Sequence, residues 1–391
     1  MTTALPQRRS VHVREVEDDA DLWALPPSGD ATVSWMHDGR GMIGWGEAAR
    51  FEITGPGQYE QAARAWSGFV SLLGGDAASA VAFTSFSFDD RGRSVLIVPQ
   101  VLVTRWENRN WVTTIGPGTP SRHTPIARPG RVRWSDGALP RDRWRGAVAE
   151  AVRRLRRGEL DKVVLARDLL AETDQPLDPR FLLRELARRH PQCWTFAVDG
   201  LIGATPEMLL RRRGDQVTSQ VLAGSSWSGD GEQLLASQPY RDEHDFAVES
   251  LLTAIAPHCA DVRASGPSVL RLRNIAHLAT DVSATLTTGV DLLGLAAAVH
   301  PTAAVGGTPR RAAADLIAEL EDLDRGRYAA PVGWLDANGD GELGLALRCA
   351  QLSGSRARLF AGCGIVAESD PDVEVRETDA KFAAVREALG A

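Results

Sequence analysis

The chain has 391 residues, of which 43% are hydrophobic and 24% are charged. This composition is typical of a globular protein with a sizeable core, in one large domain or two ordinary ones. The net charge of −7 argues against the clustered positive surfaces that bind nucleic acids or anionic membranes. The arginine-rich run at 153–157 is too short to change this and is typical of the outer face of a helix.

The cysteines and the start of the chain bear on the cellular compartment in which the protein is expected. No two cysteines form a C-x-x-C pair, so we expect buried free thiols in a reducing compartment. The first ten residues lack the apolar stretch of a secretion signal, and the most apolar tract, 290–299, is too short to span a bilayer. We therefore expect a cytoplasmic protein that binds neither membranes nor nucleic acid. The cysteines are Cys193, Cys259, Cys349 and Cys363.

Residues 10–137 form an N-terminal half in which we find no catalytic motif. Short runs of strand-forming residues alternate with turn residues, and one helix is predicted at 57–73. The segment 127–138, with its proline and glycines, is typical of a connector. We expect this half to be mainly structural, supplying sheet and core. Its strands are predicted at 31–36, 41–45, 80–86, 94–103 and 110–115.

Residues 140–391 form a second half that carries all the candidate motifs. Helical and strand periodicities alternate along it, with turn residues between them. Helices are predicted at 141–157, 178–189, 239–256, 292–299, 310–320 and 374–389. Strands are predicted at 162–169, 194–198, 201–204, 220–226, 269–272, 277–286, 331–335, 341–351 and 357–360.

Lys162 begins the strand predicted at 162–169. It is one of two lysines, the other being Lys381, and the remaining 42 of the 44 cationic residues are arginines. A lysine, unlike an arginine, can lose its proton near neutral pH when its surroundings lower its pKa. Period-2 alternation places Lys162 on the same face as Val164 and Ala166, and apolar neighbours would lower its pKa by desolvation. Lys162 is a candidate general base or nucleophile; the alternative is a solvated strand lysine.

Glu207 has a structural interpretation beside a catalytic one. It follows Thr205 and Pro206, and this order is typical of a helix start. Threonine would cap the helix, proline would take its first position, and a carboxylate would interact favourably with the helix dipole. On the local pattern alone, Glu207 belongs to a helix N-terminus.

Further carboxylates lie on two predicted helices. Glu374, Glu377 and Lys381 share one face of the last helix, and Glu243 lies beside His244 on the helix at 239–256. Carboxylates that converge from two helices suit Mg²⁺. The alternative for Glu377 and Lys381 is an ion pair worth about 0.3–0.5 kcal/mol. The alternative for His244 is a hydrogen-bonded core residue on the apolar stripe of its helix.

Nine short motifs between Asp161 and Lys381 match one enzyme family in order and spacing. Through them the chain resembles the chorismate-utilising enzymes, and most closely their isochorismate synthase members. The motifs are Lys162-Val-Val-Leu-Ala-Arg167, Gly203-Ala-Thr-Pro-Glu207, Leu222-Ala-Gly-Ser225, Glu243-His244, His300-Pro-Thr-Ala-Ala-Val-Gly-Gly-Thr-Pro309, Tyr328-Ala-Ala-Pro-Val-Gly-Trp334, Leu345-Ala-Leu-Arg348, Ala361-Gly-Cys-Gly-Ile-Val366 and Glu374-Val-Arg-Glu-Thr378.

The resemblance implies a fold and a reaction. We predict an α+β fold, in which two antiparallel β-sheets pack as a sandwich with helices on the outside. Residues 1–391 would form a single chorismate-utilising domain, as a monomer or a weak homodimer. The implied reaction is an isomerisation in which water adds to C2 of chorismate while the C4 hydroxyl leaves, giving isochorismate. This product would feed either menaquinone or siderophore biosynthesis, and the sequence leaves both open.

The resemblance also implies roles for particular residues. Lys162 would be the general base that activates water, and Glu207 the general acid that protonates the leaving hydroxyl. Because free lysine and glutamic acid have pKa values of about 10.4 and 4.3, a closed site must shift each pKa by roughly 2–3 units. Glu243 and Glu377 would hold Mg²⁺, with Glu374 as an outer ligand. The implied substrate-binding residues are Gly224, Ser225, His277, Tyr328, Arg348, Gly362 and Lys381.

Two positions bear on the product. Family members that aminate chorismate tend to carry a lysine nucleophile where this chain has Ala223. Aminating and salicylate-forming members usually have a threonine in the stretch that here is Ala303-Ala304-Val305. Both differences favour isochorismate as the final product. The runner-up is a salicylate synthase, which would eliminate pyruvate from isochorismate.

One departure motivates a different class of function. Family members usually have a lysine and an acidic residue a few positions before Glu243, where this chain has Pro239-Tyr240. An outer carboxylate near the metal would then be missing, or replaced by Asp242. A chorismate-binding paralogue without turnover is the corresponding alternative.

Overall fold

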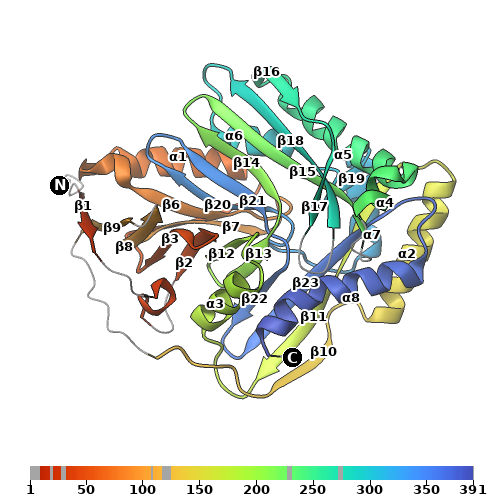
Figure 1. The fold of residues 1–391 in the computed structure, drawn as a ribbon, viewed down its shortest axis with the longest axis horizontal. Helices are drawn as coiled ribbons and strands as arrows, with labels where there is room; N and C mark the ends of the chain where they lie inside the picture. Colours follow the sequence, from red (N-terminus) through yellow and green to blue (C-terminus); the bar gives the residue numbers. More distant parts are fainter. Residues whose placement is uncertain are drawn as a thin grey trace, which may run out of the picture.

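A computed structural model describes residues 9–17, 21–27, 32–106, 109–116, 125–226, 231–271 and 276–390. Two large β-sheets dominate it, and both receive strands from the N-terminal and the C-terminal halves of the chain (Figure 1). Within these ranges, no helix is long and apolar enough to cross a membrane.

The larger sheet has thirteen strands, and the general-base candidate Lys162 lies at the start of its strand β11. Neighbouring strands are antiparallel except for the parallel pair β1 and β5. In spatial order the sheet contains β10 (Val132–Asp136), β11 (Lys162–Thr173), β23 (Arg356–Ile365), β22 (Cys349–Ser353), β13 (Leu201–Thr205), β12 (Trp194–Val198), β2 (Val33–His37), β3 (Arg40–Trp45), β8 (Val101–Trp106), β9 (Arg109–Ile115), β1 (Arg9–Val16) and β5 (Leu73–Gly75), and β19 (Gly307–Thr308) pairs with β11.

The second sheet has ten strands, and the pairs recorded in it are antiparallel. Its β15 and β18 carry the predicted substrate-binding positions Gly224 and His277. In spatial order the sheet contains β16 (Cys259–Ala264), β18 (Ala276–Leu286), β15 (Gln216–Ser226), β14 (Met208–Arg213), β21 (Gly341–Leu345), β20 (Pro331–Asp336), β6 (Val81–Ser85), β7 (Arg93–Val98) and β4 (Ala49–Thr54), and β17 (Ser268–Arg271) pairs with β18.

The α-helices lie around the two sheets (Figure 1). Aspartate caps start several of them, because the carboxylate accepts hydrogen bonds from the free N–H groups of the first turn. Asp370 does this for the last helix and Asp178 for α3, each followed by a proline at the helix start. The helices are α1 (Gln58–Val70), α2 (Arg141–Arg156), α3 (Pro179–Arg189), α4 (Gly231–Ala236), α5 (Gln238–Ile255), α6 (Leu292–Val299), α7 (Arg310–Leu320) and α8 (Pro371–Ala388), with short 3₁₀ helices at Leu22–Ala24 and Ala77–Ser79.

The main core joins the two sheets. It contains buried side chains from strands of both, such as Leu96 of β7, Phe196 of β12 and Leu343 of β21. Smaller clusters lie under the helices: one packs α3 and α8 against the larger sheet, and another packs α2 and α7 against β11. The predicted α+β fold, with two antiparallel sheets packed as a sandwich and helices outside, is confirmed.

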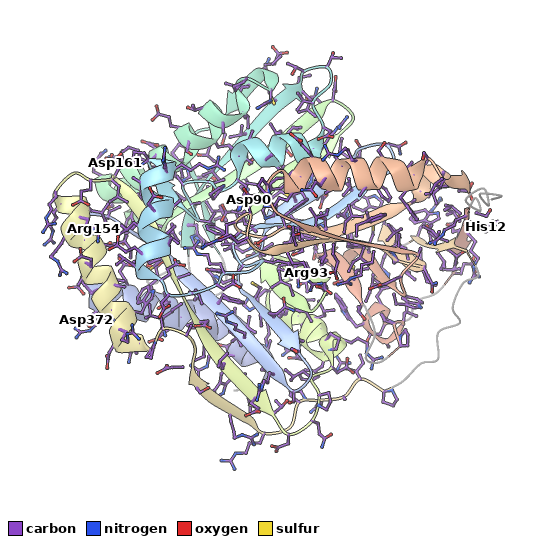
Figure 2. All side chains as sticks on the ribbon, turned by 180° about the vertical axis from the view of Figure 1, so that it is seen from behind. His12, Asp90, Arg93, Arg154, Asp161 and Asp372 are labelled. Carbon is purple, nitrogen blue, oxygen red and sulfur yellow. The ribbon has the colours of Figure 1, made fainter. Side chains whose placement is uncertain are left out.

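Two further predictions, one about the cysteines and one about the arginine-rich run, are also confirmed. All four cysteines are free and buried. The arginine-rich run ends α2 on the outside of the molecule, where Arg154 pairs with Glu150 and, at α7, with Glu319 (Figure 2).

Three connections differ from the sequence prediction because the chain changes sheets there. The predicted strand 94–103 is divided between β7 and β8, and the predicted strand 341–351 between β21 and β22. The predicted helix start at Thr205 is wrong, because β13 ends there and β14 of the other sheet begins at Met208. Period-2 alternation marks a strand but contains no information about which sheet the strand joins.

Some strands were not predicted at all. The connector predicted at 127–138 contains β10, which pairs with β11 at the edge of the larger sheet. Strands β1, β4, β5 and β16 were likewise missed. They are short or rich in charged residues, so their pairing with neighbours, rather than their own pattern, makes them strands.

Candidate active site

A cavity of about 100 Å³ lies where strands of both sheets meet α5 and α8. Ten of the predicted site residues line it, although they come from nine different parts of the chain. They are Lys162 of β11, Glu207 between β13 and β14, Gly224 of β15, Glu243 of α5, His277 of β18, Tyr328 before β20, Arg348 between β21 and β22, Gly362 of β23, and Glu377 and Lys381 of α8.

Two predicted residues are not in this lining. Glu374 is buried one turn before Glu377 on α8. Ser225 lies in β15, and its side chain falls outside the described part of the structure.

Lys162 is buried, with 3% of its side chain exposed, so the alternative of a solvated strand lysine is wrong. The predicted alternation holds: Val163 and Leu165 pack into the core under α2 and α7, while Lys162 and Val164 face the cavity. The Lys162 Nζ donates a hydrogen bond to Glu243 Oε1 at 2.9 Å. This contact links the general-base candidate to a candidate metal ligand.

Gly364 is the neighbour that makes room for this contact, and sequence reasoning missed it. It lies on β23 and pairs with Val164 of the neighbouring strand β11. A Cβ at Gly364 would lie 2.9 Å from Lys162 Cε and 3.0 Å from Glu243 Oε1. A glycine in a strand interior is a known sign of close approach by another group, but the strand predicted from the sequence ended at residue 360, four residues before Gly364.

Glu207 is buried in the connection between β13 and β14. Its backbone N–H donates to Thr205 Oγ1 at 3.2 Å, and its carbonyl accepts from Leu345 N at 3.1 Å. Burial raises the pKa of Glu207 to about 8, against the opposing influence of the positive charges of Lys162 and Lys381. At neutral pH the carboxyl therefore holds a proton, as a general acid must.

Glu207→Gln is expected to stabilise the fold at pH 7. The carboxyl has a pKa near 4.5 when unfolded and about 8 when folded, so at pH 7 only the unfolded chain gains free energy by ionising. This costs the folded state about 3 kcal/mol at most, a cost that is present above pH 4.5 and that glutamine removes. Urea unfolding at pH 7 and pH 4 measures it. An equal difference between the two proteins at both pH values would contradict this origin.

Lys381 and Glu377 lie together on one wall of the cavity. The Lys381 Nζ donates to Glu377 Oε1 at 2.5 Å and to the Gly362 carbonyl at 2.9 Å. The ion pair considered from the sequence is therefore present. It lies in the cavity rather than on the outer surface, because the Gly362 carbonyl brings β23 against α8.

The carboxylates suit a divalent cation. Burial and the charge of Glu377 raise the pKa of Glu374 to about 7, and Glu374 Oε2 is a buried oxygen without a hydrogen-bond partner among the described residues. Across the part of the chain that the structure describes, no three His, Cys, Asp or Glu side chains converge into a complete metal site. Mg²⁺ needs no such cage, since one or two carboxylates, substrate oxygens and water commonly hold it. Glu243 and Glu377 therefore fit this ion.

Tyr328 and Arg348 also line the cavity. The Tyr328 ring stacks on Phe360, with 5.1 Å between ring centroids, and a Cβ at Gly362 would lie 3.2 Å from its hydroxyl. Arg348 was expected on a strand but lies between β21 and β22 with a left-handed φ of 48°. The chain changes sheets there, and Arg348 lines the cavity. Burial lowers the pKa of Arg348 below its usual value.

His277 and His244 have different surroundings. Burial, with the charges of Arg348 and Lys381, lowers the pKa of His277 well below its usual value, so the ring that lines the cavity is neutral. His244 is a core residue, as the alternative reading had it: its ring nitrogens contact the Ala223 carbonyl at 3.3 Å and Thr280 Oγ1 at 2.7 Å.

Tyr240, of the Pro239-Tyr240 departure, lies beside the cavity residue Gly224. The Tyr240 Cβ would be 3.4 Å from a Cβ on Gly224. Burial and the charges of Glu377, Glu243 and Glu374 raise the pKa of the Tyr240 phenol. Asp242 is exposed and accepts a hydrogen bond from Gln238 at 2.6 Å, so it does not replace the missing carboxylate.

The sequence profile that describes chorismate binding enzymes matches residues 119–390. The chain belongs to this family. The match begins near the end of the N-terminal half and includes every residue of the cavity wall. This chorismate binding enzyme therefore carries most of its family-specific region in the C-terminal half.

Relatives of this chorismate binding enzyme have names that state one activity. A Mycobacterium tuberculosis protein provisionally named isochorismate synthase MenF is 40% identical over 66% of this chain and 78% of its own length. The salicylate biosynthesis isochorismate synthase of Pseudomonas aeruginosa is 39% identical over 70% of this chain and 60% of its own. The structure of MenF, the menaquinone-specific isochorismate synthase from Escherichia coli, superposes with a TM-score of 0.82 and 25% identity, covering 99% of this chain and 96% of that one.

Proposed function

We propose that this protein is an isochorismate synthase, an isomerase that converts chorismate to isochorismate with Mg²⁺. The observation that carries the proposal is a buried lysine and a buried, protonated glutamic acid in one cavity with two further carboxylates. The exchange of one hydroxyl for another needs a general acid whose pKa is raised and a general base whose pKa is lowered. The family membership and the relatives' names support the same reaction.

The reaction divides between two residues. Lys162 would accept a proton from a water molecule as the oxygen of that water forms a bond to C2. Glu207 would donate its proton to the C4 hydroxyl as the C4–O bond breaks, and that oxygen leaves as water. One water enters and one leaves, so chorismate and isochorismate are isomers. Lys162 lies on β11 of the larger sheet, and Glu207 lies where the chain passes from that sheet to the other, so the two side chains reach the cavity from separate elements.

Substrate binding would use the cationic and small residues of the cavity. Arg348 and Tyr328, with the backbone of Gly362, would bind the enolpyruvyl carboxylate. Guanidinium groups suit this role because they present several donors to a carboxylate. The ring carboxylate would lie near Lys381, His277, Gly224 and Ser225.

Glu243 and Glu377 would hold Mg²⁺, with Glu374 nearby as an outer ligand. The ion would neutralise the ring carboxylate of the substrate. Without it, Glu243 and Glu377 would face another carboxylate across a small cavity, which is an unfavourable arrangement in a region of low dielectric. Lys162 and Lys381, each in contact with one of these glutamates, limit that repulsion.

Incubating the purified protein with chorismate and Mg²⁺, followed by chromatography, is expected to yield isochorismate. EDTA should abolish turnover and added Mg²⁺ should restore it. Glu377→Gln should raise the Mg²⁺ concentration for half-maximal rate by more than about tenfold, because one anionic ligand is lost. Calorimetric titration with Mg²⁺ alone checks the same change without turnover. No consumption of chorismate by the unmodified protein would contradict the proposal.

The same experiment decides between this function and the runner-up. A salicylate synthase would release salicylate and pyruvate. Ala304 and Val305 line the cavity where salicylate-forming members usually have a threonine, so no side-chain hydroxyl is offered there. This favours isochorismate as the product. Tight chorismate binding without any product would instead support the non-catalytic alternative.

We also propose the setting in which the enzyme acts. It would work as a single chorismate-utilising domain in the cytoplasm, as a monomer or weak homodimer. Four buried free cysteines are in keeping with a reducing compartment.

A further inference from the structure

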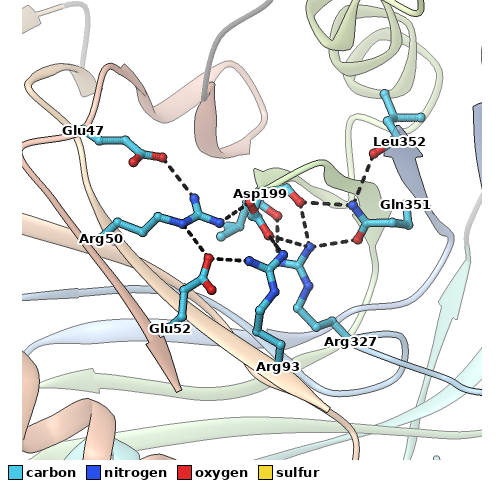
Figure 3. A network of polar contacts seen from close by, with 9 residues as sticks. Glu47, Arg50, Glu52, Arg93, Asp199, Arg327, Gln351 and Leu352 are labelled. Carbon is cyan, nitrogen blue, oxygen red and sulfur yellow. Dashed lines mark hydrogen bonds and ion pairs between the residues drawn. The ribbon is translucent and has the colours of Figure 1, made fainter. Parts of the chain in front are cut away.

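A charged cluster outside the cavity surrounds the turn between β12 and β13. Asp199 and Gly200 form this two-residue turn with left-handed φ angles of 52° and 75°. The Asp199 carboxylate accepts hydrogen bonds from Arg50 at 2.5 Å and Arg93 at 2.7 Å (Figure 3). Arg50 lies on β4 and Arg93 on β7, so the cluster joins the N-terminal half to the catalytic half.

Arg327 belongs to the same cluster and lies beside Arg93 in Figure 3. Its Nη2 donates to the Asp199 carbonyl at 2.6 Å and to Gln351 Oε1 at 2.8 Å, and its Nη1 donates to the Val198 carbonyl at 3.2 Å (Figure 3). The guanidinium is also 3.2 Å from Asp199 Oδ2. Burial lowers the pKa of Arg327 to about 10 against the opposing charge of Asp199, so it stays protonated at neutral pH.

Gln351 connects the cluster to the strand that follows Arg348. Its Nε2 donates to the Asp199 carbonyl at 3.1 Å while its Oε1 accepts from Arg327. A Cβ at Gly200 would lie 2.7 Å from this Nε2, so the glycine is what allows Gln351 to reach the turn. Hydrogen bonds therefore hold the Gln351 side-chain amide at both its nitrogen and its oxygen.

Two chain segments run from this cluster directly into the cavity. Tyr328 follows Arg327, and the next residue, Ala329, has a left-handed φ of 61°. Arg348, with its φ of 48°, precedes Gln351 by three residues. Residues other than glycine persist in this backbone region only where their surroundings hold them. Arg327 lies next to the first segment and Gln351 lies close to the second, and the hydrogen bonds of the cluster hold both side chains in place.

We propose that Arg327 is a positioning residue for the subsite that binds the enolpyruvyl carboxylate. It holds Tyr328 through the adjoining backbone and Arg348 through Gln351, and it touches no substrate itself. Arg50 and Arg93 fix the Asp199 turn on which Arg327 rests, so the N-terminal half acts on substrate binding as well as on the core. The inference rests on the proposed function, because that function assigns Tyr328 and Arg348 to this carboxylate.

Comparing two ligands in Arg327→Met tests the proposal. Chorismate carries the enolpyruvyl group, whereas shikimate has a ring carboxylate but no enolpyruvyl group. We expect the Kd for chorismate, measured by calorimetry, to rise on the order of tenfold, as when a hydrogen bond to a charged group is displaced. The Kd for shikimate should change less than about twofold. In turnover, KM should rise, whereas kcat should change less than about threefold because it depends on Lys162 and Glu207.

A second variant covers a failure of Arg327→Met to fold. Asp199→Asn keeps a residue that tolerates the left-handed turn but removes the charge that holds Arg327. It should also raise the Kd for chorismate more than the Kd for shikimate, but by a smaller factor than Arg327→Met. The matched control is Arg91→Met, which removes an arginine from an exposed ion pair with Asp89 and should change neither Kd.

Three results separate the outcomes. Equal losses for chorismate and shikimate in a folded variant would overturn the positioning role, because they indicate general damage to the cavity. Unchanged chorismate affinity in folded Arg327→Met or Asp199→Asn would overturn it as well. Failure of the unmodified protein to bind chorismate would instead overturn the proposed function.

Discussion

Lys162→Arg is expected to lower the rate of isochorismate formation by about 10²–10⁴-fold, the range that a general base contributes. Arginine keeps the positive charge and can still pair with Glu243, whose Oε1 lies 2.9 Å from the lysine Nζ. It cannot lose a proton near neutral pH, so it cannot take one from water. Chromatography of the products under saturating chorismate and Mg²⁺ measures the loss.

Two controls show whether the loss is chemical. Calorimetry should find chorismate binding to Lys162→Arg within about threefold of the unmodified protein, because only a proton acceptor is lost. In Lys162→Ala, small primary amines should restore part of the rate, and more so as pH rises and the free amine becomes available. Full activity of Lys162→Arg would remove the general-base role.

Glu207→Gln is expected to lower the rate by a similar factor, about 10²–10⁴-fold, because glutamine cannot protonate the leaving hydroxyl. In the unmodified protein, kcat/KM should fall as pH rises through about 8, where the buried carboxyl loses its proton. The sign follows from the role: the acid form is the active form, and it predominates below its pKa. Stopped assays from pH 6 to pH 9.5 measure the profile.

Glu374→Gln is the matched control for this pH dependence. Glu374 is also buried, with its pKa raised to about 7, and it lies on α8 beside the proposed metal ligand Glu377. If Glu207 is the acid, the fall near pH 8 should remain in Glu374→Gln and disappear from the residual activity of Glu207→Gln. A fall that persists in Glu207→Gln would assign it to another group.

Part of this site could be predicted from the sequence because local patterns determine it. Strand alternation places Lys162 and Val164 on one face of β11, and that face lines the cavity. Helical spacing places Glu377 and Lys381 on one face of α8. Capping residues such as Asp370 mark where helices begin. The scarcity of lysine directed attention to both residues before any contact was known.

Other features depend on contacts between distant segments and have no local signal. The helix start expected at Glu207 is absent because the chain passes there from one sheet to the other, and the resulting burial raises the pKa of its carboxyl. Arg348 faces the cavity for the same reason. The Arg327 cluster joins strands more than a hundred residues apart in sequence.

The sequence by itself thus determined the longer helices, many of the strands and the chemical groups that these elements present, because these follow from the spacing of side chains along one strand or helix. Only the tertiary structure decided which groups meet, how deeply each is buried and what charge it carries. Burial and electrostatic interaction are properties of the space around a residue, and in this protein that space is built from both sheets, α5 and α8.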